Sequence, residues 1–191
     1  MTLKEEYQKT ISEQLMKELN LSSKLAVPKL KKIVINMGVG RNRDNKQFIE
    51  EAINDVTMIS GQKPSLRKAK VSISNFKLRQ GQLAGISVTL RGDRMWDFYE
   101  KLVKIVFPRM KDFRGISPKS FDGNGNYNIG FTEHIIFPEI DANKVSYIKP
   151  LQVTISTSAK NDEEGYKLLK ALYMPFKDVK SENQKVNQSK K

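Results

Sequence analysis

The sequence predicts an α+β fold, a two-layer sandwich in which helices cover one face of a mainly antiparallel sheet. Three observations lead to this prediction. Four stretches have the apolar spacing of amphipathic helices, three others alternate apolar and polar residues, and each alternating stretch offers only one apolar face. A sheet built from such strands needs cover on one side only. We expect its other face to stay open to solvent or to a partner.

The first two helices are marked by capping residues. Thr2 and Glu5 have the spacing of a capping box and begin the first helix. The second spans about Gln47 to Ser60, and Gly61 is placed to end it. The side chains expected to face the core are Tyr7, Ile11, Leu15 and Leu19 in the first helix, and Ile49, Ala52, Ile53 and Val56 in the second.

The third and fourth helices are bounded by glycine, asparagine and proline. The third follows Gly92 and is expected to end at Pro108. The fourth begins at Asn161, with Glu164 completing a capping box, and stops before Pro175. The inward residues of the third helix are Met95, Phe98, Leu102 and Ile105.

Three segments, 32–37, 86–91 and 151–158, alternate with period two and are predicted to be strands. Their apolar sides consist of Ile33, Ile35, Met37, Ile86, Val88, Leu90, Leu151, Val153 and Ile155. The opposite sides carry Lys32, Val34, Asn36, Ser87, Thr89, Arg91, Gln152, Thr154 and Ser156. The open face of the sheet should therefore present mainly hydroxyl, amide and basic groups.

The charge balance indicates a polyanionic partner. The chain has 34 Lys and Arg against 21 Asp and Glu, a net charge of +13. Eight of the cations and a single acid lie between Lys63 and Arg94. A nucleic acid fits this excess, and so does an anionic membrane surface. A membrane-binding module, however, would need a helix with cations opposite bulky apolar residues, whereas these cations surround strands and loops.

The residue inventory argues against an enzyme. There is no Cys, which excludes disulfides, thiolate zinc sites, iron–sulfur clusters and cysteine nucleophiles and suits a reducing cytoplasm. His134 is the single histidine, lies in an apolar, strand-like stretch and is expected to be structural. No secretion signal and no apolar run of about 20 residues is found. We expect a cytoplasmic protein with no catalytic residues, cofactor, metal, membrane contact or small-molecule substrate.

Two motifs resemble ligand sites without completing them. Residues 122–133 have oxygen-bearing side chains at several positions of a calcium loop, but Tyr127 stands where such a loop requires glycine. Residues 122–126 are better explained as a tight turn. Gly38 and Gly40 follow a strand as in a dinucleotide fold, but Arg43 replaces the third glycine.

The chain is expected to form one α+β RNA-binding domain over residues 1–176, followed by a flexible basic tail over 177–191. Residues 75–85 should form a long hairpin loop. Two interpretations of this loop remain open: Phe76 is a stacking platform for RNA, or Phe76 and Leu78 pack back onto the body. A second basic loop, 108–119, is either a contact loop or an ordinary surface loop.

Six sequence strings together resemble those of bacterial large-subunit ribosomal protein five, and they occur in order over about residues 7–177. They are VINMGVG at 34–40, ISGQKP at 59–64, FKLRQG at 76–81, VTLRGDRMW at 88–96, PRMKDFRG at 108–115 and FDGNGNY at 121–127. The resemblance implies a structural, RNA-binding constituent of the large ribosomal subunit. It would bind 5S rRNA on the open sheet face and help attach it to 23S rRNA in the central protuberance.

The resemblance also implies roles for individual residues. Asn36, Gln62 and Thr89 would contact 5S rRNA through polar groups, with Lys32, Lys63 and Arg91 beside them at phosphates. Alternation independently puts Asn36 and Thr89 on the open face. The loop residues Lys77, Arg79 and Gln80 would contact P-site tRNA. A bridge to small-subunit ribosomal protein thirteen is implied as well, with Arg109, Lys111, Arg114 and the stretch after Phe137 as its candidates.

Overall fold

Five antiparallel strands form one sheet in the order β2-β3-β1-β5-β4. The computed structural model describes residues 1–42, 44–111 and 113–177, so the predicted tail lies outside the described residues except for Lys177. The strands are β1 (Leu30–Gly38), β2 (Ser65–Lys68), β3 (Leu83–Leu90), β4 (Tyr127–Phe131) and β5 (Leu151–Thr157). The three predicted strands are confirmed as β1, β3 and β5, the centre of the sheet. The two edge strands were not predicted.

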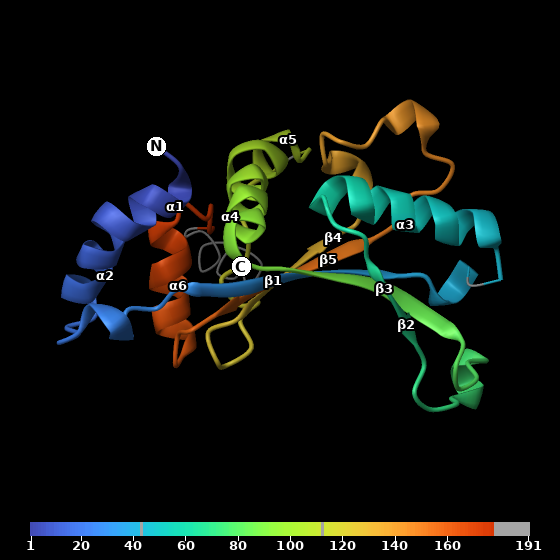
Figure 1. Ribbon diagram of the computed structural model, residues 1–191, viewed down its shortest axis with the longest axis horizontal. Helices are drawn as coiled ribbons and strands as arrows, with labels where there is room; N and C mark the ends of the chain where they lie inside the picture. Colours follow the sequence, from blue (N-terminus) through green and yellow to red (C-terminus); the bar gives the residue numbers. More distant parts are fainter. Residues whose placement is uncertain (43, 112, 178–191) are drawn as a thin grey trace, which may run out of the picture.

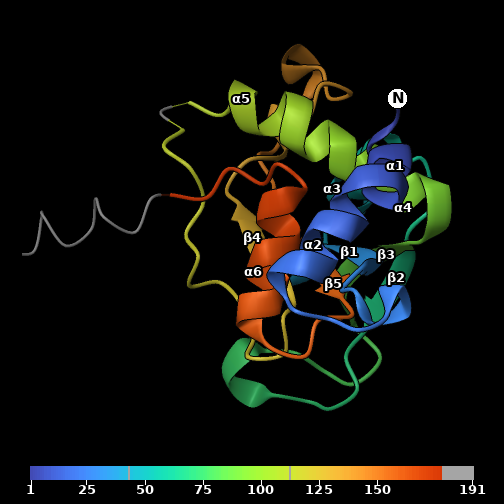
Figure 2. The same ribbon diagram turned by 90° about the vertical axis from the view of Figure 1, so that its left-hand side faces the viewer.

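The helices cover one face of this sheet, as Figures 1 and 2 show. They are α1 (Leu3–Glu6), α2 (Ser12–Glu18), α3 (Lys46–Ser60), α4 (Gly92–Lys101), α5 (Phe107–Arg109) and α6 (Asp162–Ala171). A π-helical turn joins α1 to α2 at Tyr7–Ile11, and another joins α4 to α5 at Leu102–Val106. Short 3-10 turns occupy Lys24–Ala26, Gly40–Asn42, Ser74–Phe76, His134–Ile136 and Ala142–Lys144. The predicted α+β class is confirmed.

The predicted alternation decides which strand residues enter the core. All nine apolar strand residues predicted to face inward are buried, and Ile33, Ile35, Met37 and Leu90 are 0% exposed. Helix residues such as Leu15, Val56, Leu102 and Leu168 fill the same core. Burying these side chains stabilises the fold by about 1.5–3 kcal/mol each. No helix of the described residues lies on the opposite face of the sheet, which is called the open face below.

The predicted caps are present. The Thr2 hydroxyl and the Glu5 side chain bond reciprocally as a capping box. Gly61 ends α3 in the left-handed region at φ 64°, where glycine is favoured. Asn161 caps α6 by accepting from the Glu164 amide at 2.9 Å. The Glu164 carboxylate, however, accepts from Lys160 rather than from Asn161.

The third helix differs from its prediction at its end. A regular helix would bury Ile105, but this side chain is 43% exposed and Val106 is buried instead. The π-helical turn at Leu102–Val106 explains the shift, because its wider turn moves the buried position one residue onward. Pro108 does not end the helix, since it lies within α5 and the chain becomes extended only at Met110. Proline is tolerated there because it is at the start of that last short turn.

Residues 132–150 leave the sheet and return over α3. The strand-like stretch predicted around His134 is wrong: His134–Ile136 form a 3-10 turn. His134 is 0% exposed, and its Nδ1 accepts from the Lys149 amide at 3.2 Å. Lys149 extends into the protein and donates from Nζ to Asp55 of α3 at 2.8 Å. The structural role expected for His134 is consistent with these contacts, which attach the excursion to α3.

The tight turn predicted at residues 122–126 is confirmed. Asp122 Oδ1 accepts from the amides of Asn124 and Asn126 at 2.9 and 3.1 Å. Asp162, at the start of α6, accepts from two further amides of this turn, those of Gly123 and Gly125. The side-chain amide of Asn126, donating to Asp122, lowers the pKa of that carboxyl. Asp162 therefore fixes the turn against α6 besides lying at the helix N-terminus.

Candidate nucleic-acid interface

Asn36 lies in the middle of an uncharged row that crosses all five strands of the open face. The register places it opposite Ser87 of β3 and Gln152 of β5. Ser87 in turn faces Ser65 of β2, and Gln152 faces Gly130 of β4. The strands thus bring together five residues from distant parts of the chain, all without charge. Such a row offers hydrogen-bonding groups rather than an electrostatic contact.

Thr89 belongs to the adjacent row. Val34 lies between Thr89 and Thr154, and Thr154 faces Asn128 of β4. Asn36 and Thr89 are therefore diagonal neighbours on adjacent strands, close enough to contact one partner molecule. Both lie on the open face as the alternation predicted.

The polar side chains of the open face differ in whether they already form hydrogen bonds within the protein. On the β4 side they pair with each other, since Thr154 donates to Asn128 at 2.7 Å and Ser156 donates to Asn126 at 3.0 Å. Within the described chain, the side chains of Asn36, Gln62 and Thr89 form no hydrogen bond. Their donors and acceptors remain available to an outside partner, as a recognition surface requires.

Gln62 and Lys63 lie beside the open face rather than on a strand of it. They occupy the connection between Gly61, the cap of α3, and Ser65, the first residue of β2. The Ser60 hydroxyl donates to the Gln62 carbonyl at 3.0 Å and so holds this connection. Gln62 is half-buried and Lys63 is exposed. The structure thus places both residues at the β2 edge.

Cations gather at one end of the open face around a hollow of about 420 Å³, called the cationic hollow. Lys32, Arg91 and Lys31 line it together with polar groups of β5 and the 122–126 turn. Lys31 could not be predicted from the alternation, which, continued back from Lys32, would turn this side chain to the buried side. A bulge explains the difference: Leu30 pairs with Thr157 and Lys32 with Ser156, so Lys31 is an extra residue in β1. No ion pair with an acid of the described chain is formed by these three cations.

The connection between β2 and β3 projects beyond the open face (Figure 1). This projecting loop comprises residues 69–82, since β3 already begins at Leu83, and the predicted range of 75–85 is wrong at both ends. Its base is closed by the Ala69 amide donating to the Gln82 carbonyl at 2.8 Å. An inner bridge pairs Ile73 with Leu78. The loop is therefore an ordered extension of the hairpin.

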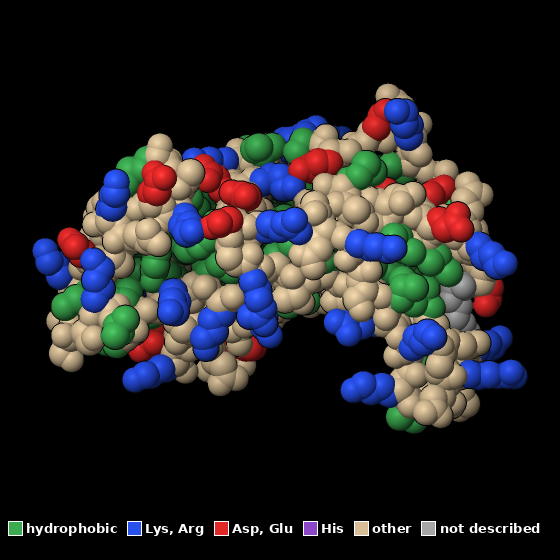
Figure 3. Space-filling model, viewed as in Figure 1, with side chains coloured by type: hydrophobic (Ala, Val, Ile, Leu, Met, Phe, Trp, Pro, Cys, Tyr) green, Lys and Arg blue, Asp and Glu red, His purple; other side chains and the backbone are tan. Residues whose placement is uncertain are grey.

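The tip of the projecting loop is basic and partly apolar. Phe76 is 74% exposed, so the interpretation that it packs back onto the body is wrong. Lys77, Arg79 and Gln80 are exposed beside it, and Lys77 adopts a left-handed conformation at φ 49°. Figure 3 shows the space below the sheet hollowed between this loop and the opposite end of the molecule, with Lys and Arg at both ends. A long anionic partner would meet cations on both sides of the uncharged rows.

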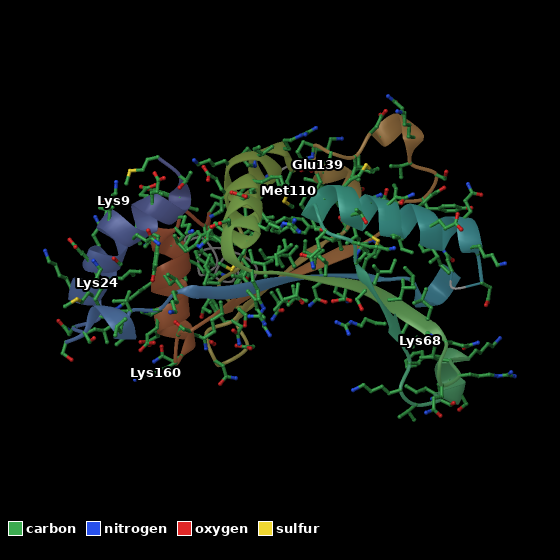
Figure 4. All side chains as sticks on the ribbon, in the orientation of Figure 1. Lys9, Lys24, Lys68, Met110, Glu139 and Lys160 are labelled. Carbon is green, nitrogen blue, oxygen red and sulfur yellow. The ribbon has the colours of Figure 1, made fainter. Side chains whose placement is uncertain are left out.

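Arg109, Lys111 and Arg114 are close in sequence to Met110, which lies on the helical side of the sheet in Figure 4. They belong to α5 and the segment that follows it, and all three are exposed. Figure 4 labels Met110 and Glu139 close together on the helical side, whereas Lys68 marks the base of the projecting loop on the other side. The candidate bridge residues thus lie in or follow a helix of the covered face, whereas the candidate 5S rRNA contacts lie on or beside the open face.

The described part of the chain contains no group of three or more His, Cys, Asp or Glu side chains placed to hold a metal ion. No helix within 1–42, 44–111 or 113–177 combines the length and apolar character needed to cross a bilayer.

Comparisons with known proteins point to one family along most of the chain. Residues 23–79 match the family described as Ribosomal protein L5, and residues 83–176 match the model for the C-terminus of the same ribosomal family. The large ribosomal subunit protein uL5 of Anaeromyxobacter sp. (strain Fw109-5) is 53% identical over 175 residues, which cover 92% of this chain and 97% of that one. The uL5 protein of Herpetosiphon aurantiacus is 54% identical over 176 residues, covering 92% and 98%.

Proposed function

The chain belongs to the ribosomal protein L5 family, and on that premise we propose that its open face binds 5S rRNA and helps attach it to 23S rRNA. Membership makes the protein a structural constituent of the large ribosomal subunit, located with the ribosome in the bacterial cytoplasm. In this proposal it performs no catalysis and acts by binding alone.

One observation carries the proposal: polar groups with no hydrogen bond inside the described chain lie on a sheet face that none of its described helices covers. Asn36 and Thr89 are neighbours on that face, and Gln62 lies at its edge. Amide and hydroxyl groups both donate and accept, so they suit the 2′-hydroxyls and base edges of RNA. An enzyme would instead require a nucleophile, a metal or an acid–base pair at such a site.

The cations supply the part of binding that does not depend on sequence. Lys32 and Arg91 line the cationic hollow, and Lys63 lies at the β2 edge near Gln62. Cations in these positions neutralise phosphates and make affinity fall with salt. They position the RNA, whereas the uncharged rows select it.

Two further contacts belong to the proposal. The projecting loop, with Lys77, Arg79 and Gln80 at its tip, contacts P-site tRNA, for which its exposed Phe76 provides a stacking surface. The helical side, with Arg109, Lys111 and Arg114, bridges to small-subunit ribosomal protein thirteen. What supports this division is that the loop and the helical side lie on opposite sides of the sheet (Figure 1).

The first prediction tests the open face directly. Asn36→Ala, Gln62→Ala and Thr89→Ala should each weaken 5S rRNA binding by about 1–3 kcal/mol, the range expected when a base-edge contact is removed. Mobility shifts at fixed salt measure the affinity. The urea midpoint should stay unchanged, because none of these side chains bonds to the rest of the described chain.

Asn54→Ala is the matched control, since Asn54 is an exposed asparagine on α3, in the helical layer. It should leave 5S rRNA binding at the wild-type level. Unchanged affinity in all three open-face variants would overturn the proposal. Equal binding to anionic vesicles and to 5S rRNA would favour a membrane-binding role instead.

A further inference from the structure

Two glycines of the open face have no evident reason within the fold to be glycine. Gly38 ends β1 on the same side as Asn36, and Gly130 of β4 faces Gln152. Both are exposed, and a Cβ built on either would have no atom within 4 Å. Neither has a positive φ, so other residues can adopt their backbone conformation.

Other glycines of this protein are required by the fold itself. A Cβ on Gly85 would lie 3.2 Å from the Met37 carbonyl, and one on Gly125 would lie 2.7 Å from Ala159. Gly61 needs its left-handed backbone conformation. Gly38 and Gly130 have neither constraint, although glycine within a strand destabilises a protein by roughly 0.5–1 kcal/mol relative to alanine. Close approach of an outside molecule to the backbone is the remaining physical reason.

The two glycines line one hollow on the open face. This hollow, called the amide hollow, has a volume of about 460 Å³. The side-chain amides of Asn36, Asn128 and Gln152 surround it, and none of the described residues that line it is charged. Asn128 already accepts a hydrogen bond from Thr154, which leaves its NH₂ group as a donor. Asn36 and Gln152 form no side-chain hydrogen bond within the described residues and can both donate and accept.

We propose that the amide hollow holds one unpaired nucleobase of the bound RNA. The base lies against the backbone of Gly38 and Gly130, which have no side chains to block its approach. The inference deepens the proposed 5S rRNA binding and rests on it. A phosphate is disfavoured as the occupant because the hollow has no cation, and the cationic hollow lies further along the same face. A flat, uncharged base fits bare backbone, and three amides can satisfy its polar edge.

Four variants of the full-length protein test whether a base lies against these glycines: Gly38→Ala, Gly38→Val, Gly130→Ala and Gly130→Val. The valine variants should bind 5S rRNA roughly tenfold more weakly, and the alanine variants should lie between them and the wild type. The thermal midpoint should be equal to that of the wild type or higher, since a Cβ at either position would meet no described atom within 4 Å and alanine and valine suit a strand better than glycine does. The slope of log affinity against log salt should not change, because no phosphate contact is lost.

Asn54→Val on α3 controls for adding an apolar side chain to the surface, and it should bind as the wild type does. Failure of the wild-type protein to bind 5S rRNA would refute the proposed function itself. If the wild type binds 5S rRNA and both valine variants bind it with the same affinity, only the inference that a base lies against Gly38 and Gly130 is overturned. A shallower salt slope in these variants would also overturn it, because a phosphate would then occupy the hollow.

Discussion

Three ionisable side chains from distant parts of the chain meet in the interior. Lys149 is 1% exposed and donates to Asp55, while His134 Nε2 lies 3.2 Å from the same carboxylate oxygen. Glu51 is a second acid near Lys149, at 3.4 Å. Burial raises the pKa of Asp55, but His134 and Lys149 outweigh this effect and bring the pKa below 3.8. Asp55 is therefore the charged partner that makes a buried lysine tolerable.

Removing one partner should destabilise the protein more than removing both. We expect Asp55→Asn to lower the free energy of unfolding by about 3–5 kcal/mol, since it leaves Lys149 buried with only the longer contact to Glu51. Asp55→Leu combined with Lys149→Met should lose less, because apolar side chains of similar size need no ionic partner. Urea unfolding of Asp55→Leu, of Lys149→Met and of the double variant measures the coupling between the two charges. Simple additivity would mean that the two charges do not stabilise each other.

The pH dependence of stability separates the effect of the Asp55 charge from that of its packing. A carboxyl whose folded pKa is lowered stabilises the fold above its unfolded pKa, and this contribution is lost as pH falls through the folded pKa. The stability difference between the wild type and Asp55→Asn should thus be constant near neutral pH and shrink below about pH 4. A difference that persists in acid would assign the effect to packing.

Individual residues were predictable where a local pattern determines them. Alternation placed Asn36 and Thr89 correctly, because neighbouring side chains along a strand point to opposite faces. Lys31 was missed because a bulge breaks that period, and nothing local in the sequence marks it. The burial of Asp55 was missed because its partner Lys149 is 94 residues away. Gly38 belongs to the incomplete dinucleotide motif and to the string VINMGVG at 34–40, and neither of these predicts its place beside Gly130.

Among the larger elements, the projecting loop carries the clearest separate role. Its inner hairpin and basic tip are built within residues 69–82, apart from the uncharged rows of the sheet. Changes at the tip should therefore leave the open face undisturbed. The loop is an element whose contribution can be measured by itself.

Lys77→Ala combined with Arg79→Ala should leave 5S rRNA binding near the wild-type level and weaken tRNA contact in assembled ribosomes. Mobility shifts measure the first quantity, and crosslinking of P-site tRNA to the protein measures the second. Lys9→Ala combined with Lys17→Ala, which removes equal charge from α2 and the turn before it, should affect neither. Loss of 5S rRNA binding in the loop variant would show that the loop contacts a different RNA from the one we propose.

Element boundaries followed their local signals, and the errors have local causes. Thr2, Gly61 and Asn161 marked helix ends correctly because capping is decided within one turn. The π-helical turn before Pro108 was not predicted, since it reflects packing against the rest of the core. All four residues of β2 are exposed, so this strand has no buried side. Its sequence therefore lacks the alternation of apolar and polar residues that predicts a strand. It forms because β3 offers it a partner.

At the scale of the whole molecule, the residues proposed to bind partners lie on two sides. The open face and the projecting loop point one way, whereas α5 and the excursion over α3 lie on the other (Figure 1). The sheet between them is fixed by its buried face, so contacts on either side need not disturb the core. Composition predicted the polyanionic partner, but only the strand order shows that the charges flank an uncharged centre.

The edge strand β2 also matters for the protein by itself, before any partner is bound. On the β4 edge, the segment before the strand supplies a backbone partner, with the Asn128 amide donating to Ser120 at 3.0 Å. On the β2 edge, a short strand with a bulge between Arg67 and Lys68 ends the sheet, and both side chains are exposed. Short, irregular, positively charged edges resist pairing with another chain. We therefore expect this edge to keep the protein from self-associating before assembly.

Replacing both of these cations should make that protection measurable. We expect Arg67→Val combined with Lys68→Val to self-associate at concentrations where the wild type stays monomeric, as measured by sedimentation velocity in the absence of RNA. Lys17→Val with Lys46→Val, which removes the same charge from α2 and α3, should remain monomeric. Association of both double variants to the same degree would assign the effect to net charge. Association of the edge variant alone would mean that two side chains on a strand of four residues keep the unassembled protein monomeric.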